Sequence, residues 1–341
     1  MRKLRAGVIG LGVGQSHFET YRDHPLCEVV AICDFSDEKL QLFSRTYSGL
    51  RYTREADELL SDPGVDIVSI ASYDQHHFAQ VCKAVEHNKH IFVEKPLSLR
   101  AKDAQTIAGL LKSHPDVKLS SNLILRRSPR FLALKEMISK GQLGDLFYLE
   151  ADYNYGRLHK LTEGWRGKAA YYSVVLGGGV HMVDLLLWLT GCRITEVMAM
   201  GTRIATRNTS FRFHDTVACI LKFENEVIGR VTANFGCVHP HFHGLNVYGT
   251  KATFRNAVPD GIWIDSSEAG HSPTPIADAY PGIHKGELLK CFIDHILYGT
   301  ESPVSHQAVF DTMSVCLAIE RSLHTHEMVQ VEYIGDEGKE Q

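Results

Sequence analysis

The chain has 341 residues, of which 44% are hydrophobic and 22% charged, and it carries a formal net charge of −4. This balance argues against a nucleic-acid footprint and against a role at a membrane surface. No apolar run reaches about 18 residues, so no transmembrane helix is predicted. No signal peptide is predicted either. The eight cysteines contain no C-x-x-C pair, which favours reduced thiols in a cytoplasmic protein.

The N-terminus predicts a dinucleotide-binding turn, because an apolar strand at residues 4–9 leads through a glycine-rich turn into an amphipathic helix. Gly10 permits the tight turn, and Gly12 lets the backbone approach a pyrophosphate at the helix N-terminus. The candidate loop residues are Gly10, Gly12, Val13 and Gly14. The usual third glycine would fall at Gln15, so a plain glycine-rich turn is the alternative interpretation.

The second predicted strand, at residues 28–33, ends in Asp34. An acidic side chain there can accept hydrogen bonds from an adenosine ribose and would repel a 2′-phosphate. Phe35 and Ser36 follow, with no Arg to receive that phosphate, so the sequence favours NAD over NADP. A helix is predicted from Ser36, its N-cap, to Tyr47.

Strands and helices continue to alternate after this point, which predicts a parallel, doubly wound sheet. The strands are predicted at 66–71, 90–93 and 117–121, and the helices at about 75–88 and 101–113. The strand at 90–93 leads into Glu94, Lys95 and Pro96, and the proline holds Lys95 extended at a strand's C-terminal end. An ammonium there can bind a substrate hydroxyl or stabilise developing negative charge. A solvated turn is the alternative.

The second half predicts helices around a sheet with period-two alternation. Its elements, in order, are a helix at 131–140, a strand at 145–155, a long connection at 156–176, an apolar helix at 180–190, several strands between 195 and 264, a loop at 266–284, helices at 285–298 and 305–325, and a strand at 329–333. In the connection, Trp165 and Arg166 pair an aromatic ring with a guanidinium, a combination that suits a sugar. Anchoring of the loop is the alternative.

Three histidines, His239, His241 and His243, alternate around Pro240. In a regular strand they would share one face, which would suit a metal ion. Pro240 argues against a regular central strand, and no carboxylate or thiolate cluster accompanies the histidines. We therefore predict no metal. Contact of one imidazole with substrate and a polar face at a subunit contact are both favoured over a metal site.

These features run in order along nearly the whole chain, and the sequence resembles the Gfo/Idh/MocA oxidoreductases. The resemblance rests on Gly10 and Gly12, Asp34, Ile70-Ala71-Ser72 with His77, the segment 87–97 around Glu94-Lys95-Pro96, Arg126 with Pro129, the segment 141–144, and Gly177-Gly178-Gly179 followed by His181 and Asp184.

The resemblance implies an α/β protein with an N-terminal Rossmann domain, expected at 1–122, and a C-terminal α+β domain, expected at 123–341, with a large, mostly antiparallel open sheet. The helix at 305–325 is a candidate to pack back on the first domain. The family also implies NAD(P)-dependent oxidation or reduction of sugars, cyclitols or related polyols. An open sheet face would favour a homodimer or homotetramer.

The resemblance also implies site residues. His181 matches the acid/base histidine of relatives, so Lys95 and His181 are the expected catalytic pair, while Asp184 is expected to be structural. Expected cofactor contacts are Gly10, Gly12, Val13, Gly14, Asp34, Ser72, His77, Glu94 and Lys95. Expected substrate contacts are Asn122, Arg126, Trp165, Arg166, Tyr172 and His181.

One departure from the family matters. Many catalytic relatives have an Asp four residues before this histidine, where this chain has Gly177. Three interpretations are open. Another group replaces this Asp, with Tyr172 as the candidate; Lys95 and His181 are enough for catalysis without it; or the protein is not a simple dehydrogenase. The alternatives are an NAD-dependent lyase or glycosidase with transient oxidation, and a non-catalytic protein that senses nucleotide and sugar.

Overall fold

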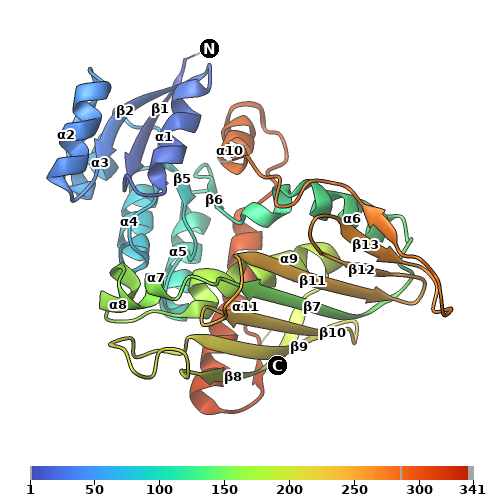
Figure 1. Ribbon diagram of the computed structural model, residues 1–341. Coiled ribbons are helices and arrows are strands. Elements are labelled where there is room, and N and C mark those ends of the chain that lie inside the picture. The colour runs from blue at the N-terminus through green and yellow to red at the C-terminus, as the bar shows by residue number, and fades with distance from the viewer. Residues whose placement is uncertain (1, 285, 337–341) are drawn as a thin grey trace. The chain divides into compact units, whose positions relative to one another are not determined.

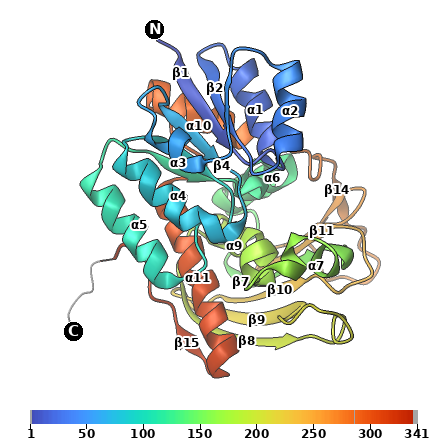
Figure 2. The ribbon, with the colours of Figure 1, turned by 90° about the vertical axis from the view of Figure 1, so that its left-hand side faces the viewer.

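The computed structural model describes residues 2–284 and 286–336 (Figures 1 and 2). The chain forms two compact units. The first unit contains Met1–Leu123, His284–Phe310 and Ile334–Gln341, and the second contains Ile124–Ile283 and Asp311–Tyr333. Residue 285, where a helix was predicted to begin, lies outside the described residues. Within the described residues, no helix combines the length and the apolar character needed to cross a membrane.

Within its described residues, the first unit holds a six-stranded parallel sheet in the order β3-β2-β1-β4-β5-β6. Its strands are β1 (Leu4–Ile9), β2 (Cys27–Cys33), β3 (Arg51–Thr53), β4 (Ile67–Ile70), β5 (His90–Val93) and β6 (Leu119–Ser121). Its helices are α1 (Gly14–Asp23), α2 (Asp37–Thr46), α3 (Ala56–Ser61), α4 (Asp74–Glu86), α5 (Ala101–Ser113) and α10 (Glu287–Tyr298). The predicted doubly wound sheet is confirmed.

The central strands of this sheet are buried along most of their length. Val8, Ile70 and Val93 are all fully buried, because helices cover a parallel sheet on both faces. Each such side chain contributes about 1.5–3 kcal/mol by leaving water. The sequence therefore reads as continuous apolar runs rather than as alternation, and these strands were predictable for that reason.

Within its described residues, the second unit holds a nine-stranded sheet in the order β14-β13-β12-β11-β7-β10-β9-β8-β15. Its strands are β7 (Leu146–Asn154), β8 (Ile194–Thr202), β9 (Thr216–Phe223), β10 (Ile228–Asn234), β11 (Phe242–Gly249), β12 (Thr253–Arg255), β13 (Gly261–Ile264), β14 (Thr274–Ile276) and β15 (Val329–Gln330). Only β7 and β10 pair in parallel; the other pairs are antiparallel. The predicted large, mostly antiparallel sheet is confirmed.

Helices lie on one face of this sheet. The helices of this unit are η1 (Ile124–Arg127), α6 (Pro129–Ser139), α7 (His159–Thr162), α8 (Trp165–Lys168), the π-helix η2 (Val175–Gly179), α9 (Val180–Thr190) and α11 (His306–Thr325), which begins in the first unit and continues into the second. Helix α9 and η2 pack on β7 and β10. The opposite face carries polar side chains, where the Arg230 guanidinium donates two hydrogen bonds to the Asp152 carboxylate.

Several predicted segments differ from the structure. The connection at 156–176 contains two short helices, and η2 begins five residues before the predicted helix at 180. The predicted loop at 266–284 contains the short strand β14. Strand β11 starts at Phe242, so of the three histidines around Pro240 only His243 lies in the strand. In the described part of the chain, no group of three His, Cys, Asp or Glu side chains could hold a metal ion.

Arg130 ties one end of this sheet to the chain segments around it. Arg130 is 2% exposed, and its guanidinium donates to four acceptors at 2.6–2.9 Å. These acceptors are the carbonyl oxygens of Asp278, Ala257 and Pro259 and the side-chain oxygen of Asn256. A single side chain therefore satisfies the turn that precedes β13 and the segment that follows β14.

Replacing Arg130 with Met would leave these buried acceptors without donors. We expect the free energy of unfolding to fall by about 3–5 kcal/mol, as measured by urea denaturation. Arg207→Met, in the exposed loop between β8 and β9, is the matched control and should change it by less than about 0.5 kcal/mol. Equal losses in the two variants would contradict the assigned role.

Candidate functional site

The glycine turn after β1 leaves room for a pyrophosphate group. Gly10 has φ +90°, and a β-carbon there would overlap the carbonyl oxygen of Ala71. Around Gly12, by contrast, no atom lies within 4 Å of the position that a β-carbon would take. Gly14 begins α1, and the preceding Val13 is exposed. The turn thus combines a tight bend with an open backbone surface at a helix N-terminus, which fits a dinucleotide.

Asp34, after β2, is buried against this turn. Its carboxylate accepts hydrogen bonds from the backbone N–H groups of Leu11, at 2.7 Å, and Ser36, at 2.9 Å. The ammonium of Lys39 lies 3.5 Å from the same carboxylate. The predicted ribose acceptor therefore also fixes the glycine turn. Lys39, in the first turn of the helix after Asp34, therefore places a cation beside the predicted ribose acceptor.

Ser72 and His77, both predicted to contact the cofactor, connect two loops. His77 is fully buried, and its ring nitrogens lie 2.7 Å from the carbonyl oxygen of Pro96 and 3.1 Å from that of Ser72. The Ser72 hydroxyl donates to the side chain of Gln80 at 2.7 Å. The imidazole thus links the loop after β4 to the loop after β5, which carries Lys95. This position favours a structural role for His77 over direct contact with a cofactor.

Glu94, the residue before Lys95, makes a second set of buried polar contacts. Its carboxylate accepts a hydrogen bond from the Asn122 amide at 2.7 Å, and Nε2 of buried His17 lies 3.4 Å away, the distance of an ion pair rather than of a good hydrogen bond. Burial favours protonation of Glu94, but His17, Lys95 and Asn122 together outweigh it and hold the pKa of Glu94 below its ordinary value. A charged carboxylate therefore links α1, the end of β5 and the end of β6.

In the second unit, His181 lies in the first turn of α9 and is 5% exposed. Its ring centroid lies 6.1 Å from that of Tyr153 on β7 and 6.3 Å from that of His243 on β11. Tyr153 and His243 are directly opposite each other in the β7–β11 register. The exposed His241 lies against His243, with ring centroids 4.8 Å apart. The predicted acid/base histidine therefore belongs to an aromatic and imidazole cluster on the helix-covered sheet face.

The glycines before α9 allow this cluster to form. A β-carbon at Gly178 would overlap the ring of Tyr153, and a β-carbon at Gly177 would overlap the hydroxyl of Tyr172. The π-helix can therefore lie directly on the sheet, which brings His181 onto Tyr153. The hydroxyl of Tyr172 occupies the space that an Asp side chain at 177 would enter.

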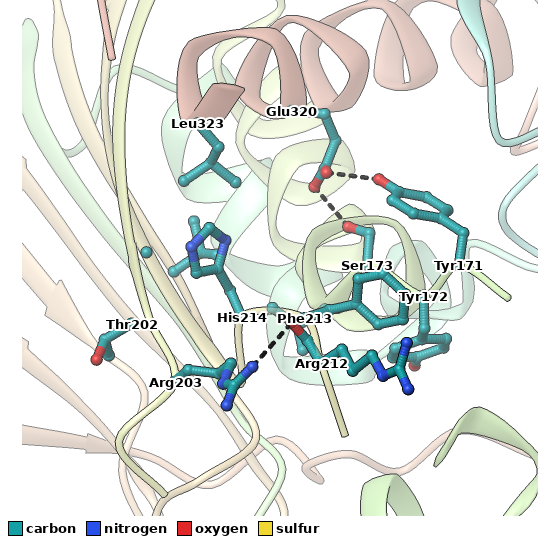
Figure 3. Close-up of a pocket in the computed structure, with 13 residues that line it drawn as sticks. Tyr171, Tyr172, Ser173, Thr202, Arg203, Arg212, Phe213, His214, Glu320 and Leu323 are labelled. Atoms are coloured by element: carbon teal, nitrogen blue, oxygen red, sulfur yellow. Dashed lines mark hydrogen bonds between the residues drawn. The ribbon is translucent and has the colours of Figure 1, made fainter. Parts of the chain in front are cut away.

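Tyr172 is held from two directions. Its hydroxyl accepts a hydrogen bond from Nε of Arg166 at 2.9 Å, and the Arg166 guanidinium stacks 4.8 Å from the ring centroid of Trp165. On the other side, the Glu320 carboxylate of α11 accepts hydrogen bonds from the hydroxyls of Tyr171, at 2.7 Å, and Ser173, at 2.5 Å (Figure 3). The two neighbours of Tyr172 in sequence are thus fixed at the edge of a cavity of about 490 Å³.

Arg126, a predicted substrate contact, lies in η1 and forms a buried ion pair with Asp184 of α9. Its Nε lies 3.1 Å from both carboxylate oxygens, and its Nη2 lies 2.6 Å from Oδ1. The hydroxyl of Thr312 also donates to this carboxylate, at 3.2 Å. Since Asp184 lies one helical turn after His181, this pair positions the histidine's helix. The structural role expected for Asp184 fits this geometry, whereas substrate contact by Arg126 stays a prediction.

Within each unit, the structure brings most of the predicted residues together. The turn at residues 10–14 contacts Asp34, and His77 and Glu94 hold the segment that carries Lys95. In the second unit, Trp165, Arg166 and Tyr172 contact one another, and the hydroxyl of Tyr172 lies against Gly177, four residues before His181. Sequence reasoning missed Lys39, His17, Tyr153 and Tyr280. Lys39 had a usable signal, because it lies in the first turn of the helix that follows Asp34.

Comparison with known proteins agrees with this architecture. Residues 4–122 match the model of the oxidoreductase family with an NAD-binding Rossmann fold, and residues 131–255 match the GFO/IDH/MocA C-terminal domain. The chain is 24% identical over 343 residues to myo-inositol 2-dehydrogenase of Thermotoga maritima, with 97% of this chain and 99% of that protein covered.

Two solved structures share the fold. Myo-inositol 2-dehydrogenase from Lactobacillus plantarum superposes with a TM-score of 0.81 at 18% identity, covering 97% of this chain and 100% of that one. Scyllo-inositol dehydrogenase from Lactobacillus casei, solved with bound NAD(H) and scyllo-inositol, gives 0.78 at 18% identity and covers 97% and 99%. The glycine turn, the buried Asp34, the glycine run before His181 and the two family matches lead to one conclusion: this chain belongs to the Gfo/Idh/MocA family of NAD(P)-dependent oxidoreductases.

Proposed function

We propose that the protein is an NAD-dependent dehydrogenase or reductase that transfers a hydride between nicotinamide and a secondary alcohol of a sugar, sugar derivative or cyclitol. The observation that carries the proposal is the histidine cluster around His181, held over an aromatic sheet face in a chain that also has a Rossmann unit. The inositol dehydrogenases among its relatives support the substrate class.

Gly10, Gly12, Val13 and Gly14 would hold the pyrophosphate, and Asp34 the adenosine ribose. When bound, the nicotinamide supplies the carbon that accepts or donates the hydride. Lys95 binds the reacting oxygen and offsets its developing charge, while His181 takes the hydroxyl proton in oxidation and returns it in reduction. Asn122, Trp165 and Arg166 are the further proposed substrate contacts.

Tyr172 is proposed to replace the Asp that many relatives have at the position of Gly177. Its hydroxyl already fills the space next to the glycine and is oriented by the N–H of Arg166. A hydroxyl held in this way can orient a neighbouring imidazole without contributing a charge. Tyr172 is 2% exposed, so water does not compete for this bond.

A homo-oligomer is proposed to form through the sheet face that lacks helices. This face exposes Met200, Ile220 and Ile228, each by 48% or more of its surface, beside the Arg230–Asp152 pair. A mixed apolar and paired-charge surface on one sheet face is typical of subunit contacts.

The missing carboxylate at 177 keeps the other two proposals open, because it is the one departure from the family at the acid/base residue. A lyase or glycosidase would form product without net NADH, and a sensing protein would bind without forming product. A panel of sugars and inositols, followed at 340 nm for NADH and by product analysis, separates all three.

Replacing Lys95 with Ala is expected to lower kcat by about 10²–10³-fold, because the reacting oxygen loses its cationic partner. Binding of NADH, measured by fluorescence titration, should change little. Lys290→Ala, on the exposed side of α10, is the matched control. Full turnover of Lys95→Ala on the true substrate would disprove the role assigned to Lys95.

Asp34→Asn should weaken NAD binding and shift the NADP/NAD ratio of kcat/KM toward NADP by about 10-fold or more. The substitution removes the charge that repels a 2′-phosphate and frees the Lys39 ammonium from its partner. The double variant Asp34→Asn with Lys39→Ala should lose this gain. An unchanged cofactor ratio in the single variant would argue against Asp34 as the discriminating residue.

Tyr172→Phe should lower kcat by about 10-fold or more and move the acidic limb of the kcat/KM pH profile, since the hydroxyl that orients His181 is lost. Tyr298→Phe, at an exposed position, is the control. Loss of activity with an unmoved pH profile would indicate a purely structural role for Tyr172.

A further inference from the structure

We propose that His243 determines substrate specificity by donating a hydrogen bond from its Nε2–H to a hydroxyl or carbonyl oxygen of the polyol. The proposal deepens the proposed function, because it assigns a hydrogen-bond donor to the same site as His181. It rests on the contacts of His243 with Tyr280 and Asn256, and on its place beside His181 and Tyr153.

The position of the single imidazole proton follows from the partners of the Tyr280 hydroxyl. This oxygen accepts the backbone N–H of His243 at 2.8 Å and lies 2.7 Å from the Nδ1 atom of the same residue. Within residues 2–284 and 286–336, the side chain of Asn256 is its other hydrogen-bond partner and acts as a donor, so Nδ1 is the acceptor left for the hydroxyl's own proton. Burial raises the pKa of Tyr280 to about 12, so the proton stays on the hydroxyl and is donated to Nδ1.

The neighbouring amide removes the remaining ambiguity in this network. Arg130 carries only donors, so Asn256 must turn its oxygen to the guanidinium, 2.9 Å away. The Asn256 nitrogen then donates to the carbonyl oxygen of His243 at 2.7 Å. Both backbone groups and Nδ1 of His243 are thereby fixed by residues outside the cluster, and the ring cannot rotate without breaking the hydrogen bond of Nδ1 to Tyr280.

With Nδ1 accepting a hydrogen bond, a neutral His243 carries its proton on Nε2. Burial, together with the charge that His241 can carry, lowers the pKa of His243 to about 3, so the imidazole is neutral at physiological pH. Among the described residues, Nε2 has no hydrogen-bond partner, although the side chain is 5% exposed. On a side chain buried to this extent, an N–H with a fixed direction discriminates between ligands, because an oxygen at that point forms a hydrogen bond that a deoxy analogue cannot form.

The place of His243 indicates the ligand class. The ring lies 5.4 Å from Tyr153 and 6.3 Å from His181, measured between ring centroids. An oxygen bound at Nε2 therefore belongs to the same small molecule as the oxygen that exchanges its proton with His181. A polyol or its ketone has an oxygen on the neighbouring carbons, whereas a deoxy analogue lacks one there.

The test measures binding and therefore does not need turnover. Calorimetric titration of inositols and their monodeoxy analogues, in the presence of NADH, should show an affinity loss of 10-fold or more for His243→Leu. His243→Gln, whose amide nitrogen falls near the Nε2 position, should recover most of this loss. One deoxy analogue should bind wild type weakly and be insensitive to both substitutions. His324→Leu, exposed near the end of α11, is the control.

Nitrogen-15 NMR tests the tautomer independently. The spectrum of wild type should show His243 protonated at Nε2 and unchanged between pH 8 and 5, and Tyr280→Phe should populate both tautomers and weaken polyol binding several-fold. Equal losses for the parent polyol and every deoxy analogue, or a proton on Nδ1 in wild type, would overturn the proposal. If wild type binds polyols with this pattern but forms no NADH, the proposed dehydrogenase function fails while the donor role of His243 stands.

Discussion

Close contact between the glycine run and the sheet determines the geometry of the second unit's site. A side chain at Gly178 would meet Tyr153 of β7, so η2 would have to move away from the sheet, and a side chain at Gly177 would displace the hydroxyl of Tyr172. His181 follows directly in the next turn, and Asp184, one turn later, holds the helix through Arg126. The absence of side chains at two positions thus decides where the imidazole lies, and the buried ion pair maintains that position.

In the first unit, buried polar groups rather than glycines hold the functional segment in position. Lys95 follows a short strand, and two buried side chains fix the chain around it. His77 contacts two backbone carbonyl groups, and Glu94 lies between His17 and Asn122. Buried polar groups of this kind cost desolvation free energy and are tolerated where they hold a functional segment in one conformation. His77, Glu94 and Asn122, which sequence patterns assign to the cofactor or substrate, thus also hold the segment that carries Lys95.

The sequence carried enough information for the long elements. Strand β1, helix α5 and helix α9 have the predicted bounds, because continuous apolar runs and helical periodicity are local signals. The short elements β3, α3, α7, α8 and β14 escaped, since three to six residues contain less than two turns of a helix or too few alternations to establish a period.

For the site, the motifs located His181 and Asp34 but not their partners. The pairing of Tyr280 with His243 joins residues 37 positions apart, and that of Glu320 with Ser173 joins residues 147 apart. No periodicity links such residues, so only the folded chain brings them together. The same holds for Tyr172, because only the folded structure places its hydroxyl in the space that a side chain at Gly177 would need.

The most direct measurement follows the hydride itself. The protein is incubated with NAD and a panel of sugars and inositols deuterated at their carbinol carbons, and both NADH and product are analysed by mass spectrometry. Direct hydride transfer to the nicotinamide predicts one deuterium in NADH for each ketone formed from one member of the panel. Product that retains its deuterium with no net NADH, or binding with no product at all, would contradict it.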